Sequence, residues 1–359
     1  WIFDIALTAN RPDCQSILGM AREVAAMLGK PLKMPATDYT ETEVKKDGFK
    51  VTVEAQDLCP RYSAHYVYDV KIGESPLWMK RRLALVGMTS ISNVVDITNY
   101  VLKEIGQPMH AFDGSYLEGN EICVRRAKDA EKIITLDEQE YEMNTDNLVI
   151  CDGVKPVALA GVMGGLNSEI RDTTESVIFE SAKFARDSVR KTARSLGKST
   201  DASARYEKGV DEYSTVLGMK RALHLIEELQ CGKVSSTHVD INTGNSIEPT
   251  EMKVSISKVN GVLGITVPEE DIVRIMKNLD FAPTVDGDQL TIHVPAYRED
   301  MLPNGENDVE RYPDVAEEVI RMYGYDHIVP TFLPTAQVTM GGLNKKQKGE
   351  LALKRTLCA

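Results

Sequence analysis

The chain has 359 residues, a formal net charge of −12, and 42% hydrophobic and 27% charged residues. This length predicts about two to four domains rather than a single core. The acidic balance argues against broad, non-specific binding of nucleic acid, which needs a basic surface. No apolar run is long enough to span a membrane and no secretory leader is legible, so we expect a cytoplasmic protein.

The cysteines and histidines give no sign of a metal site. The six cysteines are scattered without a C-x-x-C pair, and the six histidines show no metal-ligand spacing. Structural zinc is therefore not expected, and the thiols are expected to be reduced.

The first segment, residues 1–34, is expected to form a strand, a turn and a helix. The strand-like run is WIFDIAL at residues 1–7, and turn residues follow it, with Asp13 placed to cap the helix. The helix carries apolar residues at helical spacing and closes at Gly29. Residues 35–48 are polar and turn-rich, so we expect a linker there.

A mixed α/β domain is expected over residues 49–245. Alternating apolar residues over 64–72 indicate a half-buried strand, and a helix follows it. Farther along the chain, short apolar runs predict several strands, two of them joined as a hairpin. These runs are 122–124, 133–136, 141–143, 148–151 and 157–160.

A helix is predicted over residues 93–105 of this domain. Thr98 lies one position off its apolar stripe, near the buried face. Gly106 ends the helix, and Pro108 prevents its continuation. His110 follows on what the pattern indicates to be a turn. A histidine displayed there is either a hydrogen bonder that holds the fold or part of a site.

Three glycines stand in the run GVMGG at residues 161–165. Such a run indicates either a tight turn or close approach of the backbone to a ligand. It is not a phosphate loop, because no Gly-Lys-Ser/Thr follows. The strand at 177–180 then ends in Glu180, on the side that Ile178 occupies. Glu180 is therefore either a buried carboxylate, which needs a partner or a shifted pKa, or a solvated residue at the strand end.

Residues 183–208 carry eight lysines or arginines and three acids, a local balance of +5. They form either a solvated helix face or a surface that contacts nucleic-acid phosphates. Gly197 ends the helix in this segment. The small residues over 199–203 are expected to form a loop that approaches a ligand closely, and a further helix over 211–230 completes the domain.

A smaller unit is expected over residues 250–335. Its strand, two helices and hairpin follow the order of a winged helix-turn-helix, but a basic recognition helix is lacking, so DNA binding has little support. The last helix opens near Asp314. The spacing of Asp314 and Glu317 fits a capping box, and the same carboxylates with Asp300 offer an alternative reading as Mg²⁺ ligands.

Several stretches together resemble the β subunit of bacterial-type phenylalanyl-tRNA synthetase. They are TANRPDCQSILGMAREVAAMLG (8–29), CPRYSAH (59–65), VVDITNYVLKEIGQPMHAFD (94–113), AGVMGG (160–165), FESA (179–182), RYEKGVD (205–211), PAYRED (295–300) and DVAEEVIRMYGYDHI (314–328). Their order over nearly the whole chain makes the resemblance specific.

The resemblance implies an α+β, multidomain fold. A mixed α/β tRNA-editing domain would be followed by a small winged helix-turn-helix-like domain. The N-terminal OB-fold region, most of the catalytic-like domain and the anticodon-binding domain would be absent. The implied limits are 1–34 for the end of the first domain, 35–48 for the linker, 49–245 for the editing domain, 250–335 for the helix-turn-helix-like domain and 336–359 for the start of the catalytic-like domain.

The resemblance also implies a function. The β subunit would belong to an (αβ)2 heterotetramer that charges tRNA(Phe) with phenylalanine, using ATP at an active site on the α subunit. The chain by itself would not charge tRNA, and it would instead hydrolyse Tyr-tRNA(Phe) at a separate editing site.

Site residues follow from the positions that match the family's motifs. Glu180 would read the tyrosine hydroxyl, and His110 would lie beside the ester to be hydrolysed. The remaining pocket residues would be Thr98, Gly164, Thr200 and Ala202. Mg²⁺, shared with the α subunit, would be held at Asp300, Asp314, Glu317 and Glu318.

The implied chemistry uses a positioned water. No Ser-His-Asp or Cys-His arrangement is legible, so no covalent nucleophile is expected. His110 would orient the water or the terminal ribose, or act as a general base, while backbone groups near Gly164 would stabilise the oxyanion. The main alternative is a non-enzymatic nucleic-acid-binding scaffold, and a second alternative is a free-standing editing hydrolase.

Overall fold

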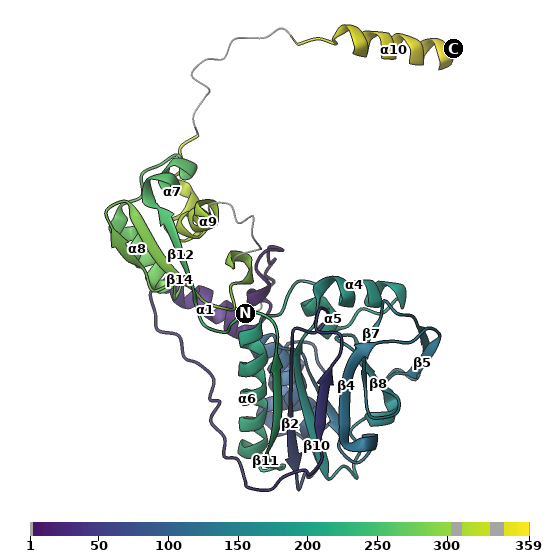
Figure 1. The fold of residues 1–359 in the computed structure, drawn as a ribbon. Helices are drawn as coiled ribbons and strands as arrows, with labels where there is room; N and C mark the ends of the chain where they lie inside the picture. The colour runs from purple at the N-terminus through teal and green to yellow at the C-terminus, as the bar shows by residue number, and fades with distance from the viewer. Residues whose placement is uncertain (1–2, 303–310, 331–340, 359) are drawn as a thin grey trace. The chain divides into compact units, whose positions relative to one another are not determined.

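The computed structural model describes residues 3–302, 311–330 and 341–358, which fall into two units (Figure 1). The first unit runs to Tyr323 and contains most of the secondary structure. The second begins at Gly324 and contains η5 (Tyr325–His327) and helix α10 (Lys345–Cys358), whose residues are all exposed. No helix in these described ranges is long and apolar enough to cross a membrane.

The N-terminal segment forms η1 (Pro12–Cys14) and helix α1 (Ile17–Leu28). The predicted strand is absent from residues 3–7, which pair with no strand of the described residues; residues 1–2 lie outside them. The predicted cap is also wrong. Ser16 caps α1 by accepting a hydrogen bond from the Gly19 N–H, because the Asp13 carboxylate is bound by Arg11.

The first unit is built on a four-stranded antiparallel sheet in the order β11-β2-β10-β3. Its strands are β2 (Arg61–Tyr68), β3 (Met109–Asp113), β10 (Ser176–Lys183) and β11 (Lys233–Asn242). Three helices share a core with one face of this sheet, and α6 runs along it in Figure 1. They are α2 (Leu77–Leu85), α3 (Asn93–Ile105) and α6 (Glu212–Glu228). Val177 and Phe179 of β10 point into this helical core.

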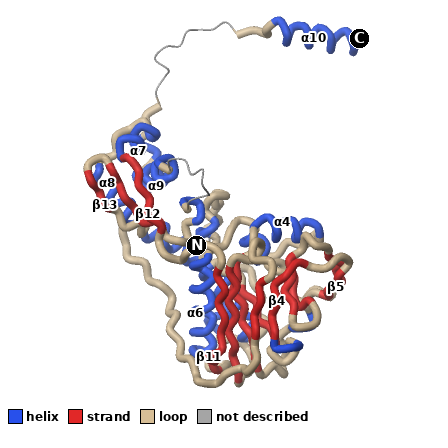
Figure 2. The backbone as a smooth tube through the Cα atoms, viewed as in Figure 1, coloured by secondary structure: helices blue, strands red, loops and turns tan. Residues whose placement is uncertain are grey.

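The opposite face packs on a second, five-stranded sheet in the order β1-β4-β7-β8-β9 (Figure 2). Its strands are β1 (Lys50–Val53), β4 (Glu121–Arg126), β7 (Leu148–Cys151), β8 (Pro156–Leu159) and β9 (Met163–Gly164), while β5 (Glu131–Ile134) and β6 (Glu140–Met143) form a separate hairpin. The strands predicted between residues 122 and 160 are thus confirmed. Ile178 and Ala182 point into the core between the sheets, so Glu180, between them on the same face of β10, points there as well.

Two helices follow β10, namely α4 (Arg186–Ser195) and α5 (Asp201–Tyr206). The predicted loop at 199–203 is wrong in part, because Thr200 is the N-cap of α5. Its side chain accepts a hydrogen bond from the Ser203 N–H, and the Ser203 hydroxyl in turn accepts one from the Thr200 N–H. Small polar residues favour loops and helix caps alike, so their composition alone does not separate the two.

The smaller region has its own core and a three-stranded sheet in the order β12-β14-β13. Its elements are β12 (Thr250–Ser255), α7 (Ile256–Leu263), α8 (Glu269–Asn278), β13 (Thr284–Asp286), β14 (Gln289–Val294), η4 (Glu299–Met301) and α9 (Tyr312–Tyr323). The predicted order of strand, two helices and hairpin is confirmed. The first turn of α8 is acidic, which disfavours phosphate binding there.

Helix α9 corrects the capping prediction. It begins at Tyr312, so Asp314 lies inside its first turn and is not the N-cap. The backbone N–H of Asp314 already donates to the Arg311 carbonyl oxygen at 3.1 Å. The helix begins earlier than the Asp-x-x-Glu spacing suggested, because Pro313 suits a first helical turn.

Candidate active site

A cavity of about 240 Å³ lies between β10, the second sheet and the helices α3 and α5. All six residues assigned to the pocket from the sequence line this cavity. They are Thr98, His110, Gly164, Glu180, Thr200 and Ala202. Since ligand cavities usually measure roughly 300–1,000 Å³, this one suits a compact group such as a single amino acid.

Glu180 supplies the buried carboxylate of the cavity. It is 5% exposed and lies opposite His110 of β3 on one side and Ala64 of β2 on the other. The hydroxyl of the buried Tyr62 donates a hydrogen bond to Glu180 Oε2 at 2.7 Å. Burial raises the pKa of Glu180 to about 7, and the bond from Tyr62 opposes that rise. The alternative of a solvated strand end is therefore wrong.

His110 lies on the edge strand β3 and not on a turn as the sequence indicated. Its ring meets Phe112 edge-on, with the ring centroids 4.6 Å apart. Its Nε2 atom is buried and has no hydrogen-bond partner among the described residues. Burial lowers the pKa of His110 to about 4, so the imidazole is neutral at neutral pH. A neutral ring with an unpartnered nitrogen is available to a bound molecule.

Gly164 lies against the His110 ring. A Cβ atom at position 164 would come within 2.3 Å of His110 Cε1 and 2.7 Å of its Nε2. The alternative of a tight turn is confirmed, and close approach to a ligand stays a prediction. Gly161, with φ of 69°, makes a turn, and Gly164 permits a close approach, which here is to the histidine in the cavity wall.

The two threonines of the cavity use their hydroxyl groups on the backbone. Thr98 is 7% exposed on α3, and its hydroxyl donates to the Val95 carbonyl oxygen at 2.7 Å. Thr200 donates to the Val162 carbonyl oxygen at 2.9 Å, which ties the start of α5 to the glycine run. Ala202 follows in the first turn of α5. These residues shape the wall and do not present an activated nucleophile.

Tyr62 is the site residue that the sequence reasoning missed. Tyr62 is fully buried, and its hydroxyl group orients Glu180. It belongs to the CPRYSAH stretch, which carries part of the family resemblance. The alternation that identified Ala64 and Tyr66 extends one step back to Tyr62. That extension would have placed its side chain on the same face of the sheet as Glu180.

The four carboxylates assigned to Mg²⁺ do not form a common set of ligands within the described ranges. Arg298 donates to Asp300 Oδ1 at 2.9 Å and to Glu318 Oε2 at 3.0 Å. Asp314 and Glu317 lie outside these two contacts, and Glu317 is exposed. The Arg298 guanidinium thus occupies the position from which Mg²⁺ would bridge Asp300 and Glu318. This arrangement therefore does not fit Mg²⁺.

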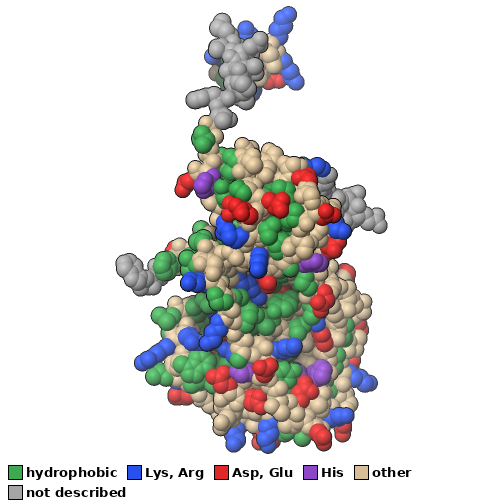
Figure 3. All heavy atoms as spheres, turned by 90° about the vertical axis from the view of Figure 1, so that its left-hand side faces the viewer, with side chains coloured by type: hydrophobic (Ala, Val, Ile, Leu, Met, Phe, Trp, Pro, Cys, Tyr) green, Lys and Arg blue, Asp and Glu red, His purple; other side chains and the backbone are tan. Residues whose placement is uncertain are grey.

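The basic side chains of residues 183–208 are of two kinds. Some pair with a carboxylate, and others are exposed. Lys183 lies 3.0 Å from Glu212, and Lys198 lies 2.5 Å from Asp137. Four cations of α4 are exposed, namely Arg186, Arg190, Lys191 and Arg194. On the face shown in Figure 3, by contrast, acidic and basic side chains are interspersed around an apolar area.

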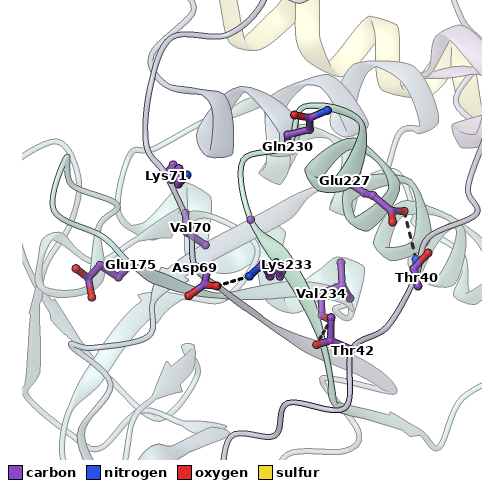
Figure 4. Close-up of a pocket in the computed structure, with 11 residues that line it drawn as sticks. Thr40, Thr42, Asp69, Val70, Lys71, Glu175, Glu227, Gln230, Lys233 and Val234 are labelled. Carbon is purple, nitrogen blue, oxygen red and sulfur yellow. Dashed lines mark hydrogen bonds and ion pairs between the residues drawn. The ribbon is translucent and has the colours of Figure 1, made fainter.

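A larger cavity of about 830 Å³ lies beside the segment 35–48, which we call the strap (Figure 4). Three of its five charged side chains are engaged with their neighbours. Lys233 lies 2.7 Å from Asp69, and Glu227 accepts a hydrogen bond from the Thr40 N–H at 3.2 Å. None of the residues assigned to the site from the sequence lines this cavity.

Two domain families match the chain. Residues 58–231 match the B3/4 domain, and residues 252–325 match the tRNA synthetase B5 domain. The first match contains the whole set of six pocket residues, and the second contains the four carboxylates. These two matches place the chain among proteins with a B3/4 domain and a tRNA synthetase B5 domain.

The relatives specify the family. The chain is 43% identical to the phenylalanine–tRNA ligase β subunit of Syntrophus aciditrophicus, over 99% of this chain and 44% of that one. It is 42% identical to the β subunit of Oceanobacillus iheyensis, over 96% of this chain and 42% of that one. The chain belongs to the family of phenylalanine–tRNA ligase β subunits, as the sequence resemblance indicated. It spans less than half the length of these curated relatives.

A distant structural likeness was also found. An N-terminal fragment of the phenylalanyl-tRNA synthetase β-subunit from Pyrococcus horikoshii has a TM-score of 0.42 and 14% identity to this chain. The likeness covers 88% of this chain and 85% of that one.

Proposed function

We propose that this chain carries an editing site that hydrolyses Tyr-tRNA(Phe) to tyrosine and tRNA. One observation carries the proposal: the buried carboxylate of Glu180 and the unpartnered Nε2 of His110 lie on paired strands and line the same compact cavity. A carboxylate suits a phenol hydroxyl, and a neutral imidazole suits a water or a ribose hydroxyl.

The need for such a site follows from the limits of the aminoacylation pocket. A hydrophobic pocket shaped for phenylalanine rejects an added hydroxyl by only about a hundredfold. A second pocket that hydrogen-bonds the hydroxyl can reject phenylalanine by about 10⁴ to 10⁵, because its buried polar group would otherwise lack a partner. Glu180 Oε2 is held by Tyr62, which leaves Oε1 as the acceptor for the tyrosine hydroxyl.

The proposed hydrolysis proceeds by attack of a positioned water on the ester carbonyl. His110 orients this water or the terminal ribose and is a weak base, since its pKa of about 4 lies well below neutral pH. Backbone groups near Gly164, which faces the same ring, stabilise the developing oxyanion. The ester bond breaks, the ribose oxygen leaves with a proton, and tyrosine is released as its carboxylate.

The proposed setting is a cytoplasmic (αβ)2 heterotetramer in which the α subunit aminoacylates tRNA(Phe) with ATP. The exposed cations of α4, which begins three residues after β10, provide a surface for phosphates of the acceptor arm. Mg²⁺ at Asp300, Asp314, Glu317 and Glu318 remains a prediction. It would require Arg298 to release Asp300 and Glu318.

The experiment compares deacylation of Tyr-tRNA(Phe) and Phe-tRNA(Phe) by the chain, alone and with the α subunit. We expect the chain to prefer Tyr-tRNA(Phe), and Glu180→Ala to lower that preference by about a hundredfold or more. Glu175→Ala, which removes an exposed carboxylate just before β10, is the matched control and should leave the preference intact.

Two results would contradict the proposal. Unchanged discrimination in Glu180→Ala would show that Glu180 does not read the hydroxyl. Salt-sensitive binding of duplex RNA without any hydrolysis, with or without the α subunit, would favour the scaffold alternative instead.

A further inference from the structure

A cluster of two histidines and one carboxylate lies outside the editing cavity. Glu41 belongs to the strap, His65 to β2 and His238 to β11. Glu41 Oε1 lies 3.9 Å from His65 Nε2 and 3.8 Å from His238 Nδ1, and the three atoms all lie within 4.8 Å of one another. The three residues come from distant parts of the sequence, which is why spacing along the chain did not reveal them.

The fold builds this cluster with a β-bulge. Between β11 and β2, four steps from Val234 to His238 correspond to only two steps from Val67 to His65. The bulge therefore sets the two histidines directly opposite each other, with their ring centroids 5.2 Å apart.

The strap brings the carboxylate to these histidines. Thr42 forms a parallel bridge with Ser235: the Thr42 N–H donates to the Val234 carbonyl oxygen at 2.9 Å, and the Thr42 carbonyl oxygen accepts from the Ser236 N–H at 3.0 Å. Figure 4 shows Thr42 beside Val234 on β11. Glu41 is thus fixed next to the bulge by backbone hydrogen bonds.

The cluster has a carboxylate but no fixed positive charge. Among the described residues, the two imidazoles lie within 4 Å of the Glu41 carboxylate, and Tyr39 donates a hydrogen bond to it at 3.4 Å. Burial lowers the pKa of His65, which is 3% exposed, so this imidazole is neutral at neutral pH. A neutral imidazole facing a carboxylate is the donor set that a divalent transition metal completes.

We propose that Glu41, His65 and His238 bind Zn²⁺ and thereby clamp the strap to the sheet. His65 Nε2 now donates to the Ser235 carbonyl oxygen at 2.8 Å, so binding of Zn²⁺ at Nε2 moves the single proton of the neutral ring to Nδ1. The Ser235 carbonyl oxygen gives up this hydrogen bond to admit the metal.

The present geometry must adjust to admit Zn²⁺, because the Ser235 carbonyl oxygen now lies at His65 Nε2 and the three ligand atoms stand up to 4.8 Å apart. Zinc lies about 2.0–2.2 Å from nitrogen and oxygen ligands, so its ligand atoms stand roughly 3.3 Å apart. The distances from Glu41 must shorten by about 0.5 Å, and the His238 ring must tilt out of its near-parallel stacking to point at the metal. Both side chains can move, since Glu41 and His238 are exposed.

The test is calorimetric titration of the metal-free chain with Zn²⁺, followed by the visible absorption of a Co²⁺ complex. We expect one equivalent to bind, and Glu41→Gln and His238→Ala to weaken the affinity by at least about tenfold. His224→Ala is the matched control. It removes another histidine that holds the strap, through the Asp38 carbonyl oxygen at 2.6 Å, but leaves the cluster intact.

A second measurement tests whether Zn²⁺ holds the strap against the sheet. Zn²⁺ should slow amide hydrogen exchange over the strap in the wild-type chain and in His224→Ala, but not in His238→Ala. The proposal is overturned if Zn²⁺ binds equally well to His238→Ala, or if no saturable binding occurs below about 100 μM. A thiolate charge-transfer band in the Co²⁺ spectrum would also overturn it, because that band would place the metal on a cysteine.

Discussion

Glu180→Gln should change how the stability of the first unit depends on pH. Burial raises the pKa of Glu180 from 4.5 to about 7, so the folded chain binds this proton more tightly than the unfolded chain does. The stabilisation is complete below the unfolded pKa and is lost as pH rises through about 7. The gap between the two values corresponds to about 3 kcal/mol, of which about 2 to 3 kcal/mol lies between about pH 5 and about pH 8.

The assay is urea unfolding of the wild-type chain and of Glu180→Gln at those two pH values, followed by circular dichroism. Glutamine keeps an acceptor for the Tyr62 hydroxyl but does not titrate, so the difference between the two proteins isolates this carboxyl. The wild-type chain should lose about 2 to 3 kcal/mol relative to the variant on going to the higher pH. Glu175→Gln, at an exposed position, keeps Glu180 and should lose as much as the wild-type chain does. If the wild-type chain and Glu180→Gln respond equally to pH, the carboxyl is not buried as described.

Three further substitutions test the rest of the site and its surroundings. Gly164→Ala places a methyl group 2.3 Å from His110 Cε1, so hydrolysis of Tyr-tRNA(Phe) should fall by about a hundredfold, as measured by deacylation. Thr200→Ala removes the cap of α5 and should cost about 1 to 2 kcal/mol in urea unfolding, whereas Thr200→Ser should restore most of it. Arg298→Ala leaves the buried Glu318 with Arg321 but without one of its guanidinium partners and should cost about 1.5 to 3 kcal/mol by the same measurement.

Much of the fold was predictable because local patterns determine it. The strands between residues 122 and 160 and the helix ending at Gly106 follow from periodicity and from glycine in the left-handed region. The six pocket residues were predicted from the resemblance to a family, and periodicity added only that Thr98 lies near the buried face. That addition was correct, since Thr98 is 7% exposed, whereas periodicity left the burial of Glu180 open.

Two of the failures share one physical cause, which is pairing between segments far apart in the sequence. His110 was placed on a turn because nothing beside it reveals that β10 pairs with it. The Glu41, His65 and His238 cluster escaped notice for the same reason, since a bulge and a docked strap assemble it. The cap predicted at Asp314 and the loop predicted around Thr200 were wrong for a different reason. The residue types that favour caps also favour loops and first turns.

The position of β3 at the edge of the central sheet sets how the activity would be lost on heating. In the described sheet, β3 pairs only with β10, so the distance between the two cavity side chains depends on a single ladder of backbone hydrogen bonds. Edge strands open locally at a lower free energy than the whole domain unfolds. Thermal inactivation should therefore precede the loss of helical signal, and a change that secures β3 would extend the working temperature range without touching the chemistry.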